Sequence, residues 1–473
     1  MPDTGELPRQ RDSSNDPKEP TSFEVEAADF LERFDDLEVV DLLIPDINGV
    51  LRGKQIPTGT LTKLAAGAVR LPRSAYCQDI FNQDVDEAGL AQSIGDPDGI
   101  CRPVAGTLAP VPWSERPAGQ VMMSIAGPDG SGDFFADPRH VLGRIVERFA
   151  ARNLTPVVAS ELEFYLIDHE TGPTGAPSPP ASPVTGERSP AAQIYLMEQM
   201  SAFEGVLGEM HRACRAQGLM VETTIAEFGP GQYEINLCHV GDAVRAADQA
   251  VLMKRALRGV ARRHGFDITF MAKPYGAHPG NGLHVHMSVL DGAGANIFDG
   301  PGEAGVNQTL RHAIGGLIAT ATDFQALFAP HANSYRRLQP GCHAPVNVGW
   351  GIDHRGAAVR VPAADGPSAR FEQRIAGADA NPYLVLAGVL AGALHGIEEG
   401  IDPGPPVEGE IESNGALNRH WDDAVDRFAG SEIVADYLGA DYQRIFTLCK
   451  RQEIATFASA ITDVEYRAYL RQV

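Results

Sequence analysis

The segment VETTIAEFGPGQYEINL, residues 221–237, most constrains the fold, because it combines two alternating strand patterns with three acidic residues around a glycine-rich bend. Its flanks, VETTI and YEINL, have the period-2 alternation of strands, and FGPGQ between them predicts a turn. The bend therefore brings Glu222, Glu227 and Glu234 together. Crowded carboxylates repel one another unless a cation joins them, and a hard divalent metal such as Mg²⁺ or Mn²⁺ binds through such oxygens. A solvated acidic hairpin is the alternative.

Two further segments place polar side chains on one face of an apolar strand. PVVASELEFYL carries Glu161 and Glu163, and GLHVHMSV carries His284 and His286. Residues two apart share a face of a strand. Because two unpaired acids are costly to bury and would drive one of the pair neutral, the first pattern favours a metal. Packed core histidines are the alternative for the second pattern, but two nitrogen donors in a chain rich in strand carboxylates favour a ligand.

The composition excludes some classes of function. With 473 residues, 43% of them apolar and 21% charged, the chain is long enough for a large core and more than one domain. Its net charge of −23 argues against nucleic-acid binding, which requires clustered Lys and Arg. The six cysteines show no CxxC spacing, so neither a zinc site nor a disulfide framework is expected.

Neither a secretory signal nor a membrane span is predicted, and the cytoplasm is the expected compartment. Residues 1–22 are polar and proline-rich, which predicts a disordered tail. The longest apolar run, YLVLAGVLAGAL at residues 383–394, is too short to span a bilayer and predicts a buried helix.

The pattern of the first 190 residues predicts a small N-terminal α+β unit followed by a larger domain. Two strand patterns within residues 39–57 flank the turn DING, and a boundary is expected between residues 113 and 133. A helix begins at Pro138, because Asp137 is a favourable N-cap and proline suits the first turn. Residues 168–190, rich in Pro, Gly and Ser, predict a flap between two strands of one domain.

Arginines recur in the C-terminal half on strand patterns that are otherwise apolar. A guanidinium binds carboxylate or phosphate bidentately, so these residues are candidate clamps, with structural salt bridges as the alternative. Metals that bridge phosphate oxygens, together with arginines that stabilise developing charge, are what phosphoryl transfer requires. No GxxxxGK[ST] loop is present, which excludes a P-loop enzyme. The arginines are Arg336, Arg337, Arg355, Arg360, Arg370 and Arg374.

Motifs from about residue 38 to the C-terminus resemble the glutamine synthetase family. ELEFYL, EFGPGQYEI, HVHMS, NSYRRLQPG and RFEQR followed by ANPYL occur in that family's order. DINGVLRGKQIP, WGIDHRGAAVRVP and IAGADANPYLVLAGVLAG look like its γ-glutamylpolyamine synthetase branch. The resemblance implies an α+β fold: a β-grasp domain at residues 23–125, and a catalytic domain at residues 126–473 whose antiparallel strands form a partial barrel with surrounding helices. It also implies a dodecamer of two hexameric rings, with active sites between neighbouring subunits.

The resemblance further implies a role for each residue of the site. Two divalent ions, Mg²⁺ or Mn²⁺, would be bound by Glu163, Glu227 and Glu234 at the first position and by Glu161, His284 and Glu372 at the second. Glutamate would contact Gly280, Arg337 and Arg374. ATP would contact Glu222, Ser288, Arg360 and Arg370, and Arg355 would stabilise the transferred phosphoryl group.

Two departures from the family concern the nucleophile. Where ammonia-using members have an acidic residue after the NSY-Arg-Arg segment, this chain has His343. The Asp-Gly-Ser-Ser motif that supplies a second carboxylate for ammonium is replaced by LPRSA at residues 71–75. A neutral imidazole can accept a proton near pH 7, but it cannot trap a small cation as two carboxylates would. For a polyamine, candidates to bind the distal charge are Asp79, Asp84 and Asp86 of a neighbouring subunit.

The sequence therefore predicts an ATP-dependent ligase that joins the γ-carboxylate of L-glutamate to an organic amine through γ-glutamyl phosphate. The amine would be a polyamine such as putrescine, or a small monoamine. Glutamine synthesis from ammonium is the first alternative. A non-catalytic structural or regulatory family member is the second, although such a scaffold has no reason to hold so many like charges together.

Overall fold

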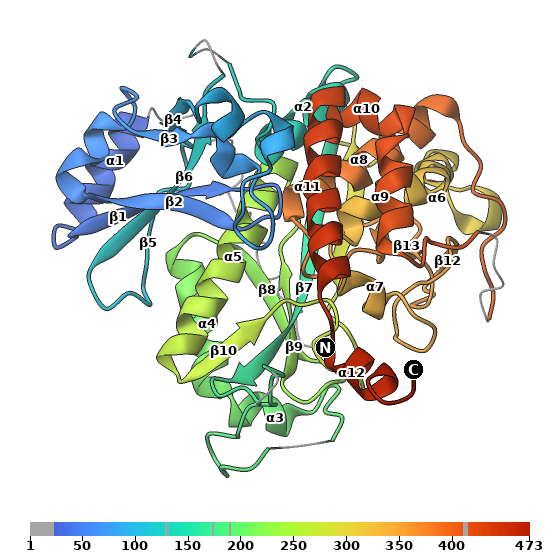
Figure 1. Cartoon of the computed structure of the whole chain (residues 1–473). Coiled ribbons are helices and arrows are strands. Elements are labelled where there is room, and N and C mark those ends of the chain that lie inside the picture. Colours follow the sequence, from blue (N-terminus) through green and yellow to red (C-terminus); the bar gives the residue numbers. More distant parts are fainter. Residues whose placement is uncertain (1–22, 128–129, 131, 173–174, 189–190, 410–414) are drawn as a thin grey trace, which may run out of the picture.

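The computed structural model describes residues 23–473 except 128–129, 131, 173–174, 189–190 and 410–414. The predicted tail at residues 1–22 lies outside the described residues. The described strands form two sheets: the smaller ends at Ile125, the larger begins at Thr155, and most helices surround the larger one (Figure 1). The division into two domains after residue 125 stays a prediction.

The smaller sheet is mixed and carries one long helix. Its elements are α1 (Phe23–Arg33), β1 (Val39–Pro45), β2 (Leu51–Pro57), β3 (Arg70–Pro72), β4 (Asp98–Pro103), β5 (Ala109–Pro110), β6 (Ala118–Ile125) and the short 3-10 helices Thr58–Lys63, Arg73–Tyr76, Asp86–Ala88 and Gln92–Ile94. Strand β1 pairs antiparallel with β2 across the predicted DING turn and parallel with β6. The strand order is β2-β1-β6-β4-β3, with β5 beside β6. Helix α1 buries Phe23, Ala27 and Phe30 on one face, and the arrangement fits the expected β-grasp fold.

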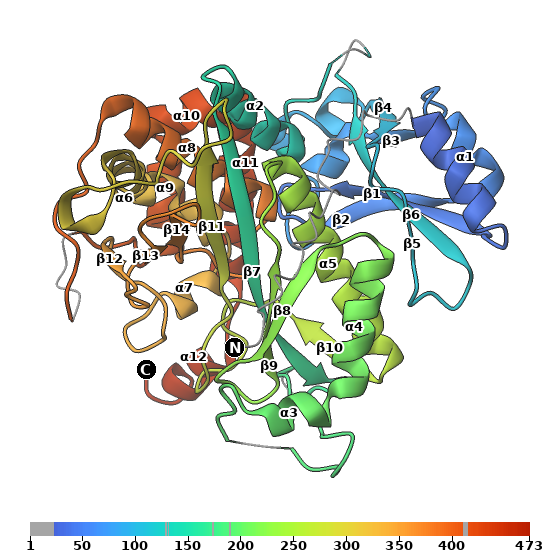
Figure 2. The ribbon, with the colours of Figure 1, turned by 180° about the vertical axis from the view of Figure 1, so that it is seen from behind.

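The larger sheet is the predicted partial barrel (Figure 2). Its strands are β7 (Thr155–Asp168), β8 (Val221–Ala226), β9 (Gln232–Leu237), β10 (Phe266–Thr269), β11 (Leu283–Leu290), β12 (Trp350–Ile352), β13 (Val359–Ala363) and β14 (Arg370–Gln373). Their order is β12-β13-β14-β11-β7-β9-β8, with β10 beside β7. All neighbours are antiparallel except the parallel pair β12 and β13. The hairpin predicted from residues 221–237 is thus β8 and β9.

The helices lie around this sheet. They are α2 (Pro138–Ala150), α3 (Met197–Ala202), α4 (Glu204–Ala216), α5 (Ala243–Arg263), α6 (Gln308–Phe328), α7 (Ser334–Arg337), α8 (Pro382–Glu399), α9 (Trp421–Ala429), α10 (Glu432–Leu438), α11 (Ala440–Ser459), α12 (Asp463–Tyr469) and the 3-10 turn Glu303–Gly305. Helix α2 begins as predicted, and the Asp137 carboxylate accepts from the Arg139 N–H. The apolar run at residues 383–394 is buried in α8. No helix of the described part of the chain has the length and apolarity that a membrane crossing needs.

Two local expectations were wrong. The alternation of DITFMAK, residues 267–273, predicts a strand that reaches Lys273, but β10 ends at Thr269. The carbonyls of Thr269 and Met271 accept hydrogen bonds from the Asn281 side chain instead of from a neighbouring strand. Arg337 lies on the short helix α7 rather than on a strand, because the backbone turns at Asn333 with i→i+3 hydrogen bonds.

Glycines allow α6 and α8 to pack with their backbones in contact. A Cβ atom on Gly316 would lie 2.1 Å from the carbonyl oxygen of Gly392, and one on Gly396 would lie 2.1 Å from that of His312. Both distances are far below van der Waals contact, so any larger residue would force these helices apart. Helix α6 of this pair also contacts the C-terminal strands β13 and β14 of the sheet.

A buried polar cluster joins the DING turn of the small sheet to helix α11. The Lys450 ammonium donates to Glu453 Oε2 at 2.9 Å and also to Asn48 Oδ1. Glu453 Oε1 accepts from Asn48 Nδ2 at 3.0 Å and from the Ile80 N–H at 2.9 Å. Burial opposes ionisation of Glu453, but the Lys450 ammonium and His331 lower its pKa to about 2. The carboxylate is therefore charged and depends on Lys450.

We expect Lys450→Met to lower the free energy of unfolding by about 3–5 kcal/mol, because it leaves a buried carboxylate without its counter-charge. Denaturant unfolding at fixed protein concentration measures this loss. The double variant Lys450→Met/Glu453→Leu should recover much of it, since neither charge of the buried pair then remains. A loss below about 1 kcal/mol in the single variant would show that Glu453 is stabilised by the hydrogen bonds alone.

Candidate active site

The carboxylates and histidines predicted from strand periodicity meet on one face of the large sheet. Glu161 and Glu163 alternate on β7 with Leu162 and Phe164, which are buried in the core. The register places His284 of β11 opposite Glu161. It likewise pairs Glu163 with Glu234 of β9, and His286 with Glu372 of β14. Four strands, none of them consecutive neighbours in sequence, thus deliver side chains to one place.

Two groups of these side chains have ligand atoms close enough to share a metal ion. Glu161, His284 and Glu372 form one group, with all ligand atoms within 4.8 Å of one another. His284 Nδ1 lies 3.4 Å from Glu161 Oε2 and 3.6 Å from Glu372 Oε1. Glu163 and Glu234 form the second group, again with His284. Glu227, expected beside Glu163 and Glu234, belongs to neither group, and His284 lies between both.

Burial and mutual repulsion disfavour the charged form of two acids of the cluster, Glu227 and Glu234, and a cation would favour it. Burial, and after it the charges of the neighbouring acids, raises the pKa of Glu234 well above its usual range. Burial and Glu163 similarly raise the pKa of Glu227 to about 7. Burial also opposes ionisation of Glu161, but hydrogen bonds from His284 and His286 outweigh it and lower the pKa of Glu161. Carboxylate oxygens with one imidazole are donors that suit Mg²⁺ or Mn²⁺, so the residues present fit the expected metals.

Arginines surround Glu372, which has no exposed side-chain surface. Arg360 Nη1 donates to Glu372 Oε2 at 2.9 Å, and Arg374 Nη1 donates to Glu372 Oε1. Arg370 Nε approaches His286 Nδ1 at 3.2 Å. Arg355 is exposed, and its carbonyl oxygen accepts from Arg374 Nε at 3.1 Å. The arginine side of the site is thus partly salt-bridged and partly, at Arg355, open to a ligand.

The segment expected to bind glutamate is held tightly against Arg337. A Cβ atom on Gly280 would lie 2.2 Å from the carbonyl oxygen of Ala272 and 2.9 Å from Arg337 Cγ, so only glycine fits. The N–H of Gly282 donates to Glu163 Oε2 at 2.6 Å. Arg337 is itself buried, with Nη1 donating to the carbonyl of Ile375 at 2.7 Å. The carboxylate cluster and the Gly280 segment are therefore directly connected.

The other residues expected to contact ATP lie at the edge of this arrangement. Ser288 follows His286 by two residues on β11 and shares its face. Glu222 is exposed on β8, where the pairing with β9 is interrupted by a bulge. Neither side chain has a hydrogen bond to the carboxylate cluster among the described residues, so their role stays a prediction.

Sequence reasoning missed two polar residues of β9 and one aromatic residue of the turn. Asn236 Nδ2 donates to Glu161 Oε1 at 3.1 Å, and Gln232 Nε2 donates to the Gly280 carbonyl at 2.9 Å. Period 2 from Glu234 could have found both, because all three lie on one face. The third is Phe228, which stacks on His343 with ring centroids 5.8 Å apart and planes inclined by 30°. That contact has no signal in the sequence.

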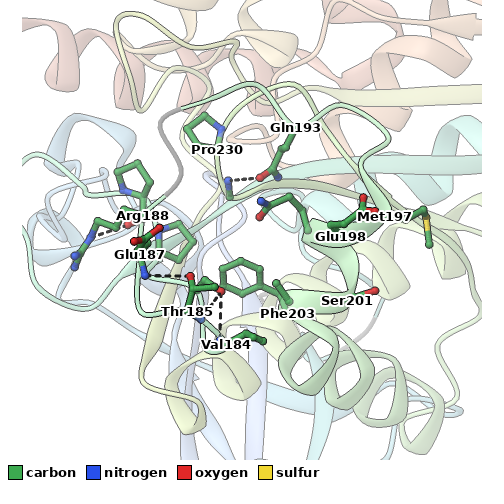
Figure 3. Close-up of a pocket in the computed structure, with 16 residues that line it drawn as sticks. Val184, Thr185, Glu187, Arg188, Gln193, Met197, Glu198, Ser201, Phe203 and Pro230 are labelled. Carbon is green, nitrogen blue, oxygen red and sulfur yellow. Dashed lines mark hydrogen bonds between the residues drawn. The ribbon is translucent and has the colours of Figure 1, made fainter.

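The segment predicted as a flap lies against the FGPGQ turn. A Cβ atom on Gly231 would lie 2.5 Å from Pro180, so the flap packs directly on the turn backbone. Gln193 Oε1 accepts from the Gly231 N–H at 3.2 Å, and Gln193 Nε2 donates to the Gln232 carbonyl at 3.0 Å. Between this segment, α3 and the turn is a cavity of about 630 Å³ (Figure 3). Its lining includes Phe203 but none of the expected metal ligands.

Comparison with known proteins identifies the family. The model of the glutamine synthetase catalytic domain matches residues 135–469. This chain belongs to the glutamine synthetase family. It is 37% identical over 458 residues to gamma-glutamylputrescine synthetase PuuA of Escherichia coli (strain K12), covering 95% of each chain. It is 32% identical over 451 residues to a glutamate–isopropylamine ligase of Pseudomonas sp, covering 93% of this chain and 96% of that one.

A solved structure shows the same fold over nearly the whole chain. The structure of a GmaS/ADP complex in its conformation 1 is similar with a TM-score of 0.82 and 28% sequence identity. The match covers 94% of this chain and 99% of that one. Membership of the family and the α+β fold with a partial barrel are thereby confirmed.

Proposed function

We propose that this protein is an ATP-dependent ligase that forms an amide between the γ-carboxylate of L-glutamate and an organic amine. The position of His343 carries the choice of an organic amine over ammonium. His343 stands where ammonia-using members have an acid, and its exposed ring stacks on Phe228, itself 41% exposed. The faces of two stacked aromatic rings can contact alkyl groups, and the pair lacks the anion that holds ammonium. The names of two relatives, with putrescine and isopropylamine, support this choice.

The proposed reaction has two steps. A γ-carboxylate oxygen of glutamate attacks the γ-phosphorus of ATP, and the bond to the bridging oxygen breaks, so that ADP leaves. The amine nitrogen then attacks the acyl carbon of γ-glutamyl phosphate, phosphate leaves with the bonding electrons, and the nitrogen loses a proton. We assign His343 to accept this proton, because a neutral imidazole is a suitable base near pH 7.

The other residues have positioning and electrostatic roles in this proposal. Glu161, Glu163, Glu234, His284 and Glu372 would hold divalent metal ions, with Glu227 as a further candidate. Such ions, when bound, neutralise phosphate oxygens. Arg337, Arg374 and Gly280 bind glutamate, whereas Glu222, Ser288, Arg360 and Arg370 bind ATP. Arg355, which is exposed, stabilises the phosphoryl group in transfer.

The proposal also covers the assembly, the compartment and the acids that would bind the distal charge of a polyamine. We expect a dodecamer of two hexameric rings, as the resemblance implies, and we expect the cytoplasm as its compartment. Asp79 no longer suits the distal charge of a polyamine, because its oxygens accept hydrogen bonds from Phe81 N, Gln83 N and Gln452 Nε2. Asp84 and Asp86 stay candidates.

The amine preference tests the proposed function. With glutamate and Mg-ATP fixed, we expect kcat/KM for putrescine or a small monoamine to exceed that for ammonium by at least about 100-fold, since apolar contacts and missing anions each contribute about 1–3 kcal/mol. Phosphate release across a set of amines measures this ratio. Comparable efficiency with ammonium would instead identify a glutamine synthetase. If the folded protein binds ATP but turns over no amine, it is a non-catalytic member of the family.

Variants at His343 separate charge from shape. His343→Glu should shift the preference toward ammonium, because it restores an anion at this position. His343→Asn is the matched neutral control: the backbone here has φ of 57°, which asparagine tolerates better than most residues. The control should lower turnover without moving the preference toward ammonium. A shift of equal size in both variants would contradict the electrostatic account.

A further inference from the structure

A second cavity lies across the large sheet from the carboxylate cluster. Its volume is about 710 Å³, and it lies between the DING turn, helix α5 and the end of β10. Phe270 in its wall packs on Phe164 of β7, with ring centroids 5.9 Å apart. Phe164 and Glu163 are neighbours on β7, so their side chains point to opposite faces. The sheet therefore separates this cavity from the proposed active site.

Much of the cavity wall is apolar and aromatic. A Cβ atom on Gly259 of α5 would lie 2.2 Å from Trp113, so the indole ring lies directly on the helix backbone. Trp113 and Phe270 offer aromatic surface, and Ile80 and Phe457, both exposed, lie on the DING side. Such a wall suits a ring or a branched alkyl group.

Helix α5 adds a row of cations, most of which already have partners. The row consists of Lys254, Arg258 and Arg262, whose spacing of four residues places them on one side of the helix. Lys254 Nζ donates to the carbonyls of Ala378 and Ala380; Arg255 binds Asp41 and Gln120; and Arg262 binds Asp267. Lys254 and Arg262, at the two ends of the row, therefore already have partners, as does the neighbouring Arg255.

Arg258 is the exception in this row. Its guanidinium lies 4.8 Å from the centre of the Phe270 ring and has no hydrogen bond or ion pair with any residue that the structure describes. The Arg258 side chain is exposed and lines the cavity. The only carboxylate among the described lining residues is Asp379, which accepts from Ser334 Oγ at 2.6 Å. An anion entering the cavity would thus meet an unpaired cation beside aromatic rings.

We propose that this cavity is a binding site for a small organic anion with an aromatic or branched apolar group. The carboxylate, sulfonate or phosphate of the ligand pairs with Arg258, and its apolar part packs on Trp113 and Phe270. A guanidinium binds such anions bidentately, and a ring beside it adds a cation–π contact.

The cavity wall is also connected to the segment assigned to glutamate. Asn333 Oδ1 accepts from the Lys273 N–H at 2.8 Å, and Asn333 Nδ2 donates to the Lys273 carbonyl at 3.0 Å. Asn281, next to Gly280, donates to the carbonyl of Met271 at 2.9 Å. Occupancy of the cavity should therefore change the KM for glutamate. This consequence, unlike the binding itself, rests on the proposed function.

The test measures binding of 8-anilinonaphthalene-1-sulfonate to the full chain by fluorescence and calorimetry. We expect one saturable site per chain that saturating Mg-ATP and glutamate do not displace. Arg258→Gln should weaken binding at least tenfold, and Ile80→Trp, which fills the cavity from its exposed side, should also weaken it. Arg212→Gln, at an exposed arginine of α4 without an ion pair to a described residue, is the matched control and should bind as the unmodified chain does.

Three results would overturn the proposal. They are equal affinity in Arg258→Gln, displacement of the probe by Mg-ATP, and equal affinity for the cationic analogue naphthalen-1-ylmethylammonium. The first would show that Arg258 does not bind the anion. The second would place the probe in the active site, and the third would show that apolar contact alone holds it. A change in amine preference leaves this test unaffected, because its readout is binding and not turnover.

Discussion

Glu372→Gln is expected to lower the rate of phosphate release by about 10³-fold or more, because it removes a carboxylate ligand of a metal that neutralises phosphate oxygens. Glu372 is fully buried between Arg360, Arg374 and His284. Glutamine keeps the shape and one acceptor oxygen for these partners, so the loss of rate reports the charge rather than a cavity. Glu163→Gln, in the other group of ligands, should behave similarly.

Metal binding can be measured separately from turnover. Mg²⁺ or Mn²⁺ should stabilise the unmodified protein against unfolding by about 2–3 kcal/mol near 100 times its dissociation constant. This gain should be much smaller in Glu372→Gln. Asp353→Asn is the matched control, since Asp353 also binds Arg360, at 2.6 Å, but is largely exposed and lies outside both ligand groups. Near-normal turnover of Glu372→Gln at saturating Mg²⁺ would contradict the metal assignment.

Local sequence patterns predicted those strands and helix ends that are determined by neighbouring residues. Period-2 alternation identified β7, β8 and β9, and it placed Glu161 with Glu163 on one face because alternation depends only on neighbouring residues. Asp137 before Pro138 marked the start of α2 for the same reason. The end of β10 was missed because the Asn281 side chain, from another segment, takes its carbonyls.

Contacts between distant segments set the parts of the site that the sequence did not predict. His284 lies between both groups of carboxylates because β11 is next to β7 and β14, an order that periodicity does not determine. Glu227 lies just beyond the end of β8, where alternation no longer places a side chain. Similarly, the stacking of Phe228 on His343 joins two loops from separate parts of the chain. The order of the motifs in the sequence predicted which residues belong to the site, whereas only the fold shows how they are arranged.

Arg355→Ala is expected to lower kcat by about 10²-fold or more, with a smaller change in the KM for glutamate. Arg355 is exposed on the loop between β12 and β13, and its carbonyl accepts a hydrogen bond from Arg374. A guanidinium that contacts the phosphoryl group chiefly as charge develops stabilises the transition state more than the bound substrate, and its loss therefore appears in kcat. Steady-state phosphate release with glutamate and ATP varied in turn measures both constants.

Two comparison variants distinguish stabilisation of the phosphoryl group by Arg355 from binding of glutamate. Arg355→Lys keeps the charge but loses the planar fork, so its kcat should lie between those of the alanine variant and the unmodified protein. Arg337→Lys should instead raise the KM for glutamate, because Arg337 lies against Gly280, and its folding must be checked since its guanidinium also binds the Ile375 carbonyl. If Arg355→Ala changes only KM, Arg355 binds a substrate in its ground state and the phosphoryl role belongs to another arginine, with Arg370 beside His286 the next candidate.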